Sequence, residues 1–203
     1  MAFVALTFAV AAGSLSTFDG QVLHAMSSAW RPSLHSLFQA IAELGGLELT
    51  SILMLGLVIF LVRRGSAGDA WVLVAFGAAQ VLETLYKSGL HHPGPPLSAT
   101  HSDGPSITEQ VARLGNSFPS GHMVRAVIVY GLIAFVVRRL APWPVARALA
   151  IPVAVLLLLV EAFDRLYLDV HWESDVIGGT LLGAIGLLSA TVWLDRPRVP
   201  TQK

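Results

Sequence analysis

The sequence contains no cysteine, and charged residues make up only 13% of its 203 residues. The absence of cysteine excludes disulfides, thiolate nucleophiles and thiolate metal sites. The scarcity of charge argues against an ordinary soluble domain, because 54% of the residues are hydrophobic and the mean hydropathy is +0.67. The formal net charge is zero, so the chain lacks the basic surface that nucleic acid binding requires. We therefore expect a single domain, residues 1 to 203, in a lipid bilayer.

Long apolar segments predict an all-α bundle of six transmembrane helices. The expected spans are Ala2 to Leu15, Leu47 to Val62, Ala70 to Leu85, Met123 to Val137, Val145 to Phe163 and Val176 to Leu194. The first is interpreted as a span and not as a signal peptide, because no Lys or Arg precedes it. From Asp19 to Gly45, apolar residues recur at helical spacing among polar ones, which predicts short interfacial helices on the outer side.

The distribution of Lys and Arg predicts the orientation of the bundle. Eight of the thirteen fall in one alternate set of loops, namely Arg63, Arg64, Arg138, Arg139, Arg147, Arg196, Arg198 and Lys203. The positive-inside rule makes that side cytoplasmic, and six spans then place both termini there. Every candidate catalytic group falls on the opposite side. We expect a multi-pass protein of a bacterial cell membrane with an extracytoplasmic site.

One cluster of polar residues precedes the last apolar segment. His171 and Asp175 are four residues apart, so on a helix the carboxylate can accept a proton from one ring nitrogen. The other nitrogen is then a nucleophile that can form a phosphohistidine, and Arg165, on the loop before this helix, can bind two phosphate oxygens. Taken alone, the cluster also fits a structural role, with Asp175 capping the helix and Arg165 reaching the membrane interface.

The tetrapeptide Pro119-Ser120-Gly121-His122 opens the fourth apolar segment. Gly121 lets the backbone approach a ligand closely, and the exposed N–H groups of a first helical turn form an anion site. His122 is placed to face His171 and to protonate a leaving oxygen. Taken alone, the tetrapeptide is also a plain helix N-cap with Ser120 as the capping residue. Because both clusters fall on one side of the membrane, a site for phosphoryl transfer is favoured.

These residues resemble the signatures of the type 2 phosphatidic acid phosphatase family. The family pattern is a Lys-containing stretch ending in Arg-Pro, then Pro-Ser-Gly-His, then Ser-Arg followed by five residues, His, three residues and Asp. The second signature matches completely, and the third matches at Arg165, His171 and Asp175. The resemblance covers about Leu47 to Leu194. It implies a six-helix membrane phosphatase that needs no metal or other cofactor.

The resemblance also implies a role for each matching residue. In the family pattern His171 attacks phosphorus, Asp175 orients it and His122 protonates the leaving group. The residues that would hold the phosphate are Lys87, Ser120, Gly121 and Arg165. The implied substrates are phosphatidic acid, phosphatidylglycerol phosphate and polyprenyl diphosphates of the undecaprenyl type, so the expected partners are a lipid phosphate and membrane lipids.

The first signature is incomplete in this chain. It reads Lys87-Ser-Gly-Leu-His-His-Pro-Gly94-Pro95, so Lys87 and Pro95 match, but Gly94 stands where the family has arginine. One phosphate cation is therefore missing. His91 and His92 lie beside the gap and are alternative donors, although histidines in a loop of Pro and Gly are more often solvated.

Additional acidic residues surround the third signature. Asp164 replaces the serine before Arg165, and Asp169 and Glu173 add further negative charge. We expect these acids to face solvent, with binding of a cationic headgroup as the alternative. Glu161 lies four residues before Arg165 inside an apolar segment, so it either orients that arginine or forms a purely structural pair with it.

Arg125 is the candidate that could supply the missing charge. It lies three residues after His122, on nearly the same helical face and about one turn deeper, where an unpaired guanidinium is costly in lipid. One alternative is that it pairs with Glu83 or Glu161 and holds helices together. The other is that it binds or supports the phosphate. Glu83 is one turn before Lys87, and we expect those two to pair.

The function favoured by these observations is hydrolysis of lipid phosphates at the outer leaflet. The loop from Gly89 to Phe118 is expected to be a lid or entry loop beside the site. A lipid-binding or lipid-flipping bundle with a degenerate phosphate site is the alternative outside enzymes. A relative of the vanadate-dependent haloperoxidases is disfavoured, because that group is soluble and this chain is strongly apolar.

Overall fold

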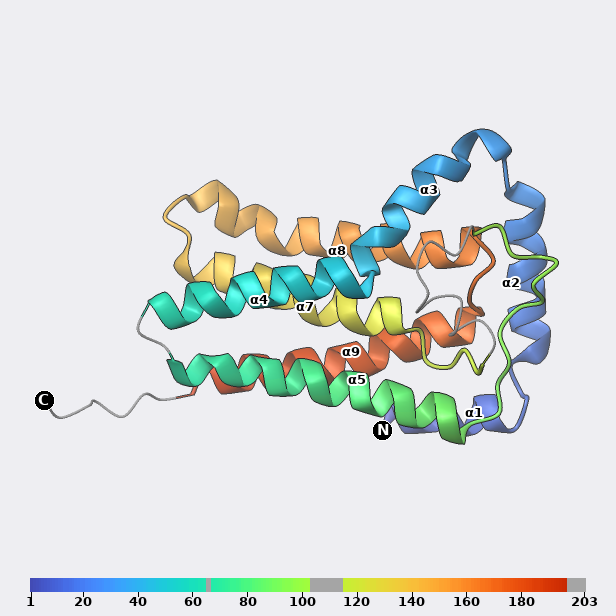
Figure 1. The fold of residues 1–203 in the computed structure, drawn as a ribbon, viewed down its shortest axis with the longest axis horizontal. Helices are drawn as coiled ribbons and strands as arrows, with labels where there is room; N and C mark the ends of the chain where they lie inside the picture. The colour runs from blue at the N-terminus through green and yellow to red at the C-terminus, as the bar shows by residue number, and fades with distance from the viewer. Residues whose placement is uncertain (65–66, 103–114, 197–203) are drawn as a thin grey trace, which may run out of the picture.

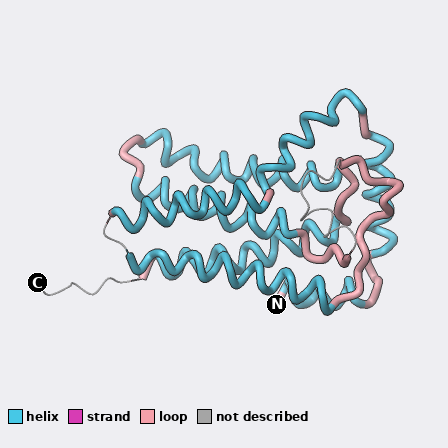
Figure 2. The backbone as a smooth tube through the Cα atoms, in the orientation of Figure 1, coloured by secondary structure: helices cyan, strands magenta, loops and turns pink. Residues whose placement is uncertain are grey.

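The computed structural model describes residues 1–64, 67–102 and 115–196, which form helices and turns with a single isolated β-bridge (Figure 1, Figure 2). In chain order the helices are α1 (Ala2–Ala11), α2 (Ser16–Ala29), α3 (His35–Ala42), α4 (Leu47–Arg63), α5 (Val72–Gly89), α7 (Gly121–Leu140), α8 (Pro144–Tyr167) and α9 (Glu173–Leu194). The short 3-10 helices are η1 (Pro32–Leu34), η2 (Glu43–Gly45) and η3 (Ala67–Trp71). The predicted all-α class is confirmed for these residues.

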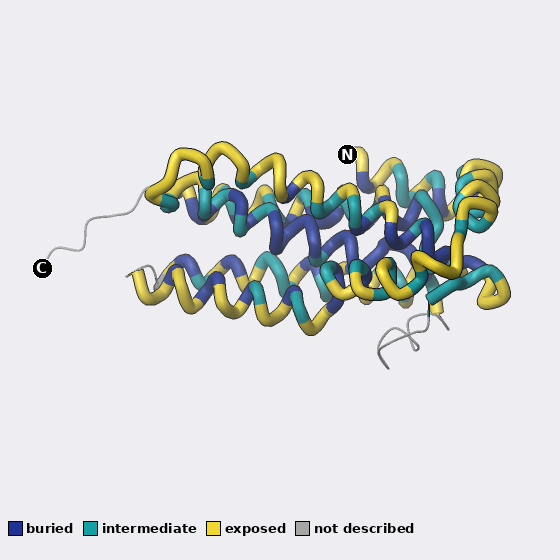
Figure 3. Tube along the Cα trace, turned by 90° about the horizontal axis from the view of Figure 1, so that it is seen from above, coloured by how far each residue is buried: buried dark blue, intermediate teal, exposed yellow. Residues whose placement is uncertain are grey.

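Helix α7 occupies the centre of the bundle. It packs against α4, α5, α8 and α9, and most of its residues are buried, including His122 near its start. The outer helices show the opposite pattern, because large apolar side chains such as Val81, Leu156 and Leu159 are exposed on them (Figure 3). Polar groups inside and apolar groups outside are the arrangement that suits lipid as the surrounding solvent.

Glycines on one face of α9 bring its start close to α7. Gly179 and Gly183 are four residues apart, the spacing that lets two helix backbones approach closely. A Cβ atom at Gly179 would collide with the carbonyl oxygen of Ser120, and one at Gly183 would lie 2.8 Å from the Val127 Cβ. This close contact allows the Ser120 N–H to donate to the Asp175 carbonyl at 3.0 Å. Small residues therefore set the spacing of two predicted site elements.

Helix α1 is shorter than predicted, because it ends at Ala11 and not at Leu15. Gly13 adopts a positive φ of 65°, and the N–H groups of Gly13 and Ser14 bond back to carbonyls of the last turn, which closes the helix. Ten residues reach about 15 Å, roughly half of the hydrocarbon core of a bilayer. The chain then bends by 89° into α2, which lies across one end of the bundle (Figure 1). The predicted end at Leu15 is therefore wrong by four residues, and whether this segment spans the membrane stays a prediction.

Two of the described helices, α8 and α9, are long and apolar enough to cross a membrane individually. Two bent pairs would each add a span if counted as one unit: α1 with α2, and the segment Pro32–Gly45 with α4, which bends by 42°. The count of six spans, the single domain of residues 1 to 203 and the interfacial position of α2 and α3 stay predictions.

Candidate active site

The predicted site residues come from helix ends that lie at the same end of the bundle, the end crossed by α2 (Figure 1). They are Lys87 in the last turn of α5, Ser120, Gly121 and His122 at the start of α7, Arg165 in the last turn of α8, His171 in the following turn, and Asp175 in the first turn of α9. Arg165 thus belongs to a helix and not to the expected loop. The antiparallel arrangement joins signatures that are far apart in the sequence.

His171 and Asp175 form the predicted pair. His171 Nδ1 lies 3.2 Å from Asp175 Oδ2, and the Trp172 N–H donates to the same oxygen at 3.0 Å. The Asp175 side chain is fully buried, whereas the His171 ring remains 12% exposed. With Nδ1–H donating to the carboxylate, Nε2 keeps its lone pair.

The surroundings of His171 favour its neutral form. Burial lowers the pKa of His171 below the ordinary value, against the raising effect of Asp175, and the positive charges of Lys87 and Arg165 lower it further. A neutral imidazole at neutral pH is the state that a nucleophile requires. Lys87 and Arg165 are also the two predicted phosphate cations.

Asp175 also meets a second histidine. His92 Nε2 lies 3.3 Å from Asp175 Oδ1, and the His92 side chain is only 18% exposed. The interpretation of this loop as solvated therefore holds for His91, which is exposed, and fails for His92. No local signal distinguishes the two, since they are adjacent in the same loop.

The start of α7 already holds an anionic group. A Cβ atom at Gly121 would collide with the Glu83 carboxylate, so the glycine lets that carboxylate lie against the helix N-terminus. Lys87 Nζ donates to Glu83 Oε1 at 2.9 Å, which confirms the predicted pair, and Arg125 Nη1 lies 3.7 Å from Oε2. The Ser120 hydroxyl is buried and makes no hydrogen bond within the described residues. The place expected to bind phosphate is thus suited to an anion.

Arg125 connects this anion site to His122. Its Nε donates to the Gly45 carbonyl at 3.0 Å, Nη1 donates to Gln80 at 3.3 Å, and Nη2 lies 3.4 Å from His122 Nδ1. The pairing with Glu83 that sequence reasoning offered is present. Because a guanidinium only donates, His122 Nδ1 accepts from it, which leaves the proton of a neutral ring on Nε2. Direct contact between Arg125 and phosphate stays a prediction.

Arg165 lies among buried carboxylates. Its side chain is 2% exposed, it pairs with Asp164, and its Nε lies 3.6 Å from Glu161 Oε1. Asp164 is itself fully buried, so the expectation that it faces solvent is wrong. These two carboxylates offset the charge of the guanidinium and fix its orientation.

Two further carboxylates fasten α2 across the site, and sequence reasoning missed both contacts. Asp19 accepts the N–H of Ser174 at 2.9 Å and its hydroxyl at 2.8 Å, which caps the start of α9 from another helix. Asp169 is buried, contrary to expectation, and accepts from the Ser27 hydroxyl at 2.6 Å, with His101 Nε2 at 3.5 Å. Burial raises the pKa of Asp169, against the lowering effects of Ser27 and His101. No local spacing could indicate contacts between segments so distant in sequence.

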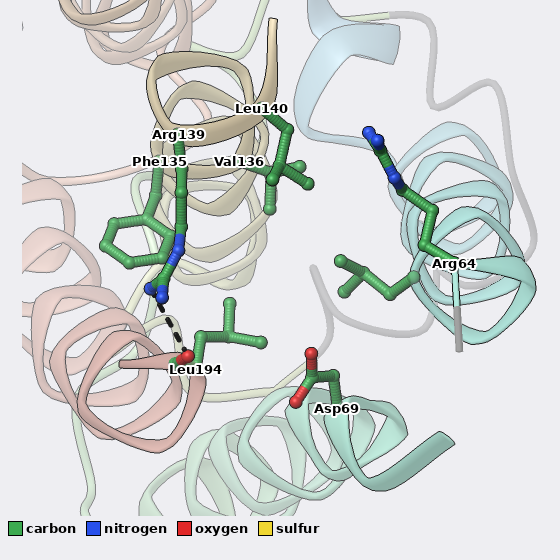
Figure 4. A pocket seen from close by; sticks show the side chains of 8 residues that line it. Arg64, Asp69, Phe135, Val136, Arg139, Leu140 and Leu194 are labelled. Carbon is green, nitrogen blue, oxygen red and sulfur yellow. Dashed lines mark hydrogen bonds between the residues drawn. The ribbon is translucent and has the colours of Figure 1, made fainter. Parts of the chain in front are cut away.

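A cavity of about 150 Å³ lies at the opposite end of the bundle (Figure 4). Its walls are formed by Leu61, Arg64, Asp69, Phe135, Val136, Arg139, Leu140 and Leu194. It contains no histidine. Arg139 bonds to the Leu194 carbonyl at 3.4 Å, as the dashed line in Figure 4 shows, and Asp69 pairs with Arg196 at 3.2 Å. The candidate catalytic residues His122 and His171 therefore lie at the other end.

Part of the predicted lid, residues 103–114, lies outside the described residues. Among the residues that are described, no cluster of three or more His, Asp or Glu side chains has the geometry to hold a metal ion.

A family model for the PAP2 superfamily matches residues 69–198, which is more than half of the chain. The chain belongs to the PAP2 superfamily. The resemblance to type 2 phosphatidic acid phosphatases is thereby confirmed, and the PAP2 match spans the positions of all three signatures, including the incomplete first one.

Known PAP2 proteins extend the comparison. Phosphatidylglycerophosphatase B of Bacillus subtilis (strain 168) is 27% identical over 186 residues, or 90% of this chain and 86% of that protein. YbjG of Escherichia coli (strain K12), a candidate undecaprenyl-diphosphatase, is 39% identical over 77 residues, or 38% of this chain and 34% of that protein.

The fold is shared with a solved PAP2 structure. The crystal structure of a transmembrane PAP2-type phosphatidylglycerolphosphate phosphatase from Bacillus subtilis matches with a TM-score of 0.81 and 23% identity, covering 97% of this chain and 94% of that chain. This PAP2 chain therefore has the fold of a transmembrane protein. With its apolar helices, it is a membrane protein.

Proposed function

We propose that this PAP2 protein is a lipid phosphate phosphatase that works through a phosphohistidine on His171. The observation that carries the proposal is the pair of His171 Nδ1 and the buried Asp175 at 3.2 Å, which directs Nε2 of His171 to act as the nucleophile. Membership of the superfamily and the names of the similar proteins support the same reaction class.

The phosphate group would bind at the start of α7. Backbone N–H groups of the first helical turn and the buried Ser120 hydroxyl offer donors, and Lys87 and Arg165 offer positive charge. Both cations are paired with carboxylates in the structure, so an incoming phosphate shares them with those carboxylates or displaces Glu83. Arg165 has five N–H donors and can keep Asp164 while binding a phosphate oxygen.

The first chemical step forms the phosphoenzyme. His171 Nε2 attacks phosphorus, and the bond from phosphorus to the lipid oxygen breaks as the N–P bond forms. An anionic substrate favours the imidazolium form of His122, which gives its Nε2 proton to that oxygen and returns to a neutral ring. The Arg125 contact at Nδ1 orients the ring before the substrate binds. Asp175 balances the positive charge that develops on His171.

The second step releases phosphate. His122, now unprotonated at Nε2, takes a proton from a water molecule that attacks phosphorus, and the N–P bond breaks with its electron pair returning to His171. The products are inorganic phosphate and the original enzyme. The chemistry uses only side chains of this chain, so we propose that no metal or other cofactor takes part.

The substrate supported best is phosphatidylglycerol phosphate, because the relative named for it aligns with 90% of this chain. Phosphatidic acid presents the same monoester group. A polyprenyl diphosphate is the second candidate, supported by the shorter match to YbjG. We propose that the site lies on the extracytoplasmic side and the C-terminal end of α9 on the cytoplasmic side, because the arginine-rich loops lie at the other end of the bundle. The cytoplasmic N-terminus expected from six spans does not follow from this arrangement, because α1 reaches only about half of the hydrocarbon core.

The test is phosphate release by the purified full-length protein in detergent micelles containing each lipid. The wild type is expected to release phosphate from the monoester, and His171→Ala is expected to release none. His24→Ala is the matched control, because His24 is exposed and lies outside the site. A folded wild type that binds the lipid without releasing phosphate would support the lipid-binding or lipid-flipping alternative and overturn the proposal.

A further inference from the structure

We propose that His92 is a positioning residue of this active site, holding Asp175 from the side opposite His171 and supplying the positive charge that Gly94 does not. The inference rests on the proposed phosphatase function and concerns the same site. It does not follow from the family signatures, which contain no histidine at this position.

The two oxygens of the Asp175 carboxylate contact different histidine rings. Oδ2 accepts from His171 and from the Trp172 backbone, whereas Oδ1 faces His92 Nε2 at 3.3 Å. Oδ1 and His92 Nε2 are both buried, and neither makes a hydrogen bond within the described residues, so their contact is an ion pair between two otherwise unsatisfied atoms. A buried carboxylate oxygen without a donor is costly, so His92 is the contact that makes this orientation of Asp175 favourable.

The backbone around His92 is fixed by contacts across the site. The His92 N–H donates to Asn116 Oδ1 at 2.9 Å, and Nδ2 of the Asn116 side chain donates to the Lys87 carbonyl at 2.7 Å. The Ser117 N–H donates to the His92 carbonyl at 2.8 Å, and Trp172 Nε1 donates to the carbonyl of Pro93 at 2.8 Å. His92 therefore sits on a framework that joins the end of α5 to the turn before α7.

The charge state of His92 depends on the acidic groups that face it. Asp175 lies at the start of α9 and Asp19 on α2, while the His171 ring lies on the other side of Asp175. Burial lowers the pKa of His92, but the close contact with the Asp175 carboxylate and the negative charges of Asp175 and Asp19 outweigh it, so the pKa is raised. Protonated His92 is thus present at and below its raised pKa and is lost as pH rises through that value.

Because the pKa of His171 is lowered and the pKa of His92 is raised, we predict that activity has a bell-shaped dependence on pH. The acidic limb reflects protonation of His171, whose pKa is lowered, and the alkaline limb reflects loss of the proton from His92. Gly94 has space for a replacement cation, because the nearest atom to a Cβ there is the Ser117 Cβ at 3.5 Å. An arginine at position 94 can therefore take over the charge.

The experiment measures kcat and KM across pH for the wild type, His92→Gln, His92→Arg and His91→Gln. His92→Gln keeps a donor but no charge, so we expect kcat/KM to fall roughly tenfold or more, as for loss of a charge-assisted contact, with loss of the alkaline limb. His92→Arg should keep activity at higher pH, and Gly94→Arg should partly restore His92→Gln. His91→Gln is the adjacent exposed control and should match the wild type.

The outcomes separate this inference from the proposed function. If the wild type releases phosphate and His92→Gln has the same kcat/KM and pH profile, the inference is overturned and the phosphatase proposal stands. If the wild type releases none, binding of vanadate is compared across pH in the same proteins. If vanadate binding weakens at alkaline pH in the wild type but not in His92→Arg, the role of His92 is supported. If the two proteins have the same dependence of vanadate binding on pH, that role is overturned. Should His92→Gln fail to fold, His92→Arg alone decides by the position of its alkaline limb.

Discussion

The two ends of the bundle contain the same kinds of charged residue in different surroundings. At the end crossed by α2, Arg165 is 2% exposed and lies between two fully buried carboxylates. At the opposite end, Arg139 is 45% exposed and pairs with Asp195, which is 72% exposed. An exposed pair contributes little to stability, whereas a buried one is strongly coupled to its surroundings. The distribution of burial, and not the number of charges, therefore distinguishes the end that contains the candidate site from the opposite end.

The largest effect on activity is expected from Asp175→Asn, at the end crossed by α2. The amide offers His171 either a donor or a weak acceptor, so the Nδ1 proton loses its anionic partner and the reactive tautomer is no longer favoured. We expect kcat to fall on the order of a thousandfold or more, by analogy with the triad carboxylate of serine proteases. Phosphate release under saturating lipid measures this. A fall of less than tenfold would remove Asp175 from the mechanism.

Changing Arg165 to Ala compares the ends directly, with Arg139→Ala as the matched control. Loss of Arg165 leaves Glu161 and Asp164 without their cation, so we expect a cost of roughly 3 to 5 kcal/mol in stability and loss of most activity. Loss of Arg139 should cost less than about 1 kcal/mol. Unfolding in detergent measures both. Equal losses would contradict the contrast between the ends.

The variant Arg125→Ala examines the residue that joins the anion site to His122. Loss of its contact at His122 Nδ1 removes the side chain that orients the ring, so we expect kcat to fall roughly 10- to 100-fold with a smaller change in KM. Gly94→Arg measured alone and combined with it completes a coupling cycle. Partial rescue would indicate that Arg125 also contacts phosphate, and a rise in KM alone would contradict the positioning role.

Single-cysteine labelling tests which end faces outward and should leave activity unchanged. The chain has no native cysteine, so Ser98→Cys at the site end and Pro142→Cys at the other end report cleanly. An impermeant thiol reagent added to intact cells is expected to label position 98 and not position 142. The reverse pattern would place the site in the cytoplasm.

Local patterns in the sequence predicted much of this arrangement. The pairs Glu83 with Lys87 and His171 with Asp175 follow from a spacing of four residues on a helix, and the structure contains both. The convergence of the signatures at one end follows from antiparallel helices. The end of α1 was missed, because hydropathy alone does not register the positive φ of Gly13.

The remaining contacts depend on the tertiary fold. His92 reaches Asp175, and Asp19 caps Ser174, only because α2 and the loop after α5 fold over the start of α9. Asp169 was expected to face solvent, yet it is buried and accepts a hydrogen bond from Ser27. None of these three contacts leaves a periodic signal in the sequence, since the partners are far apart in the chain.

The most direct test of the account is acid-quench trapping of a labelled phosphoenzyme. Wild-type protein mixed with lipid carrying radiolabelled phosphate should yield an acid-labile adduct on His171, and His122→Ala should form it more slowly, because the leaving oxygen lacks its proton donor. His171→Ala should yield no adduct. Label retained in His171→Ala, or wild-type turnover by a folded protein with no trapped adduct on His171, would contradict the central claim.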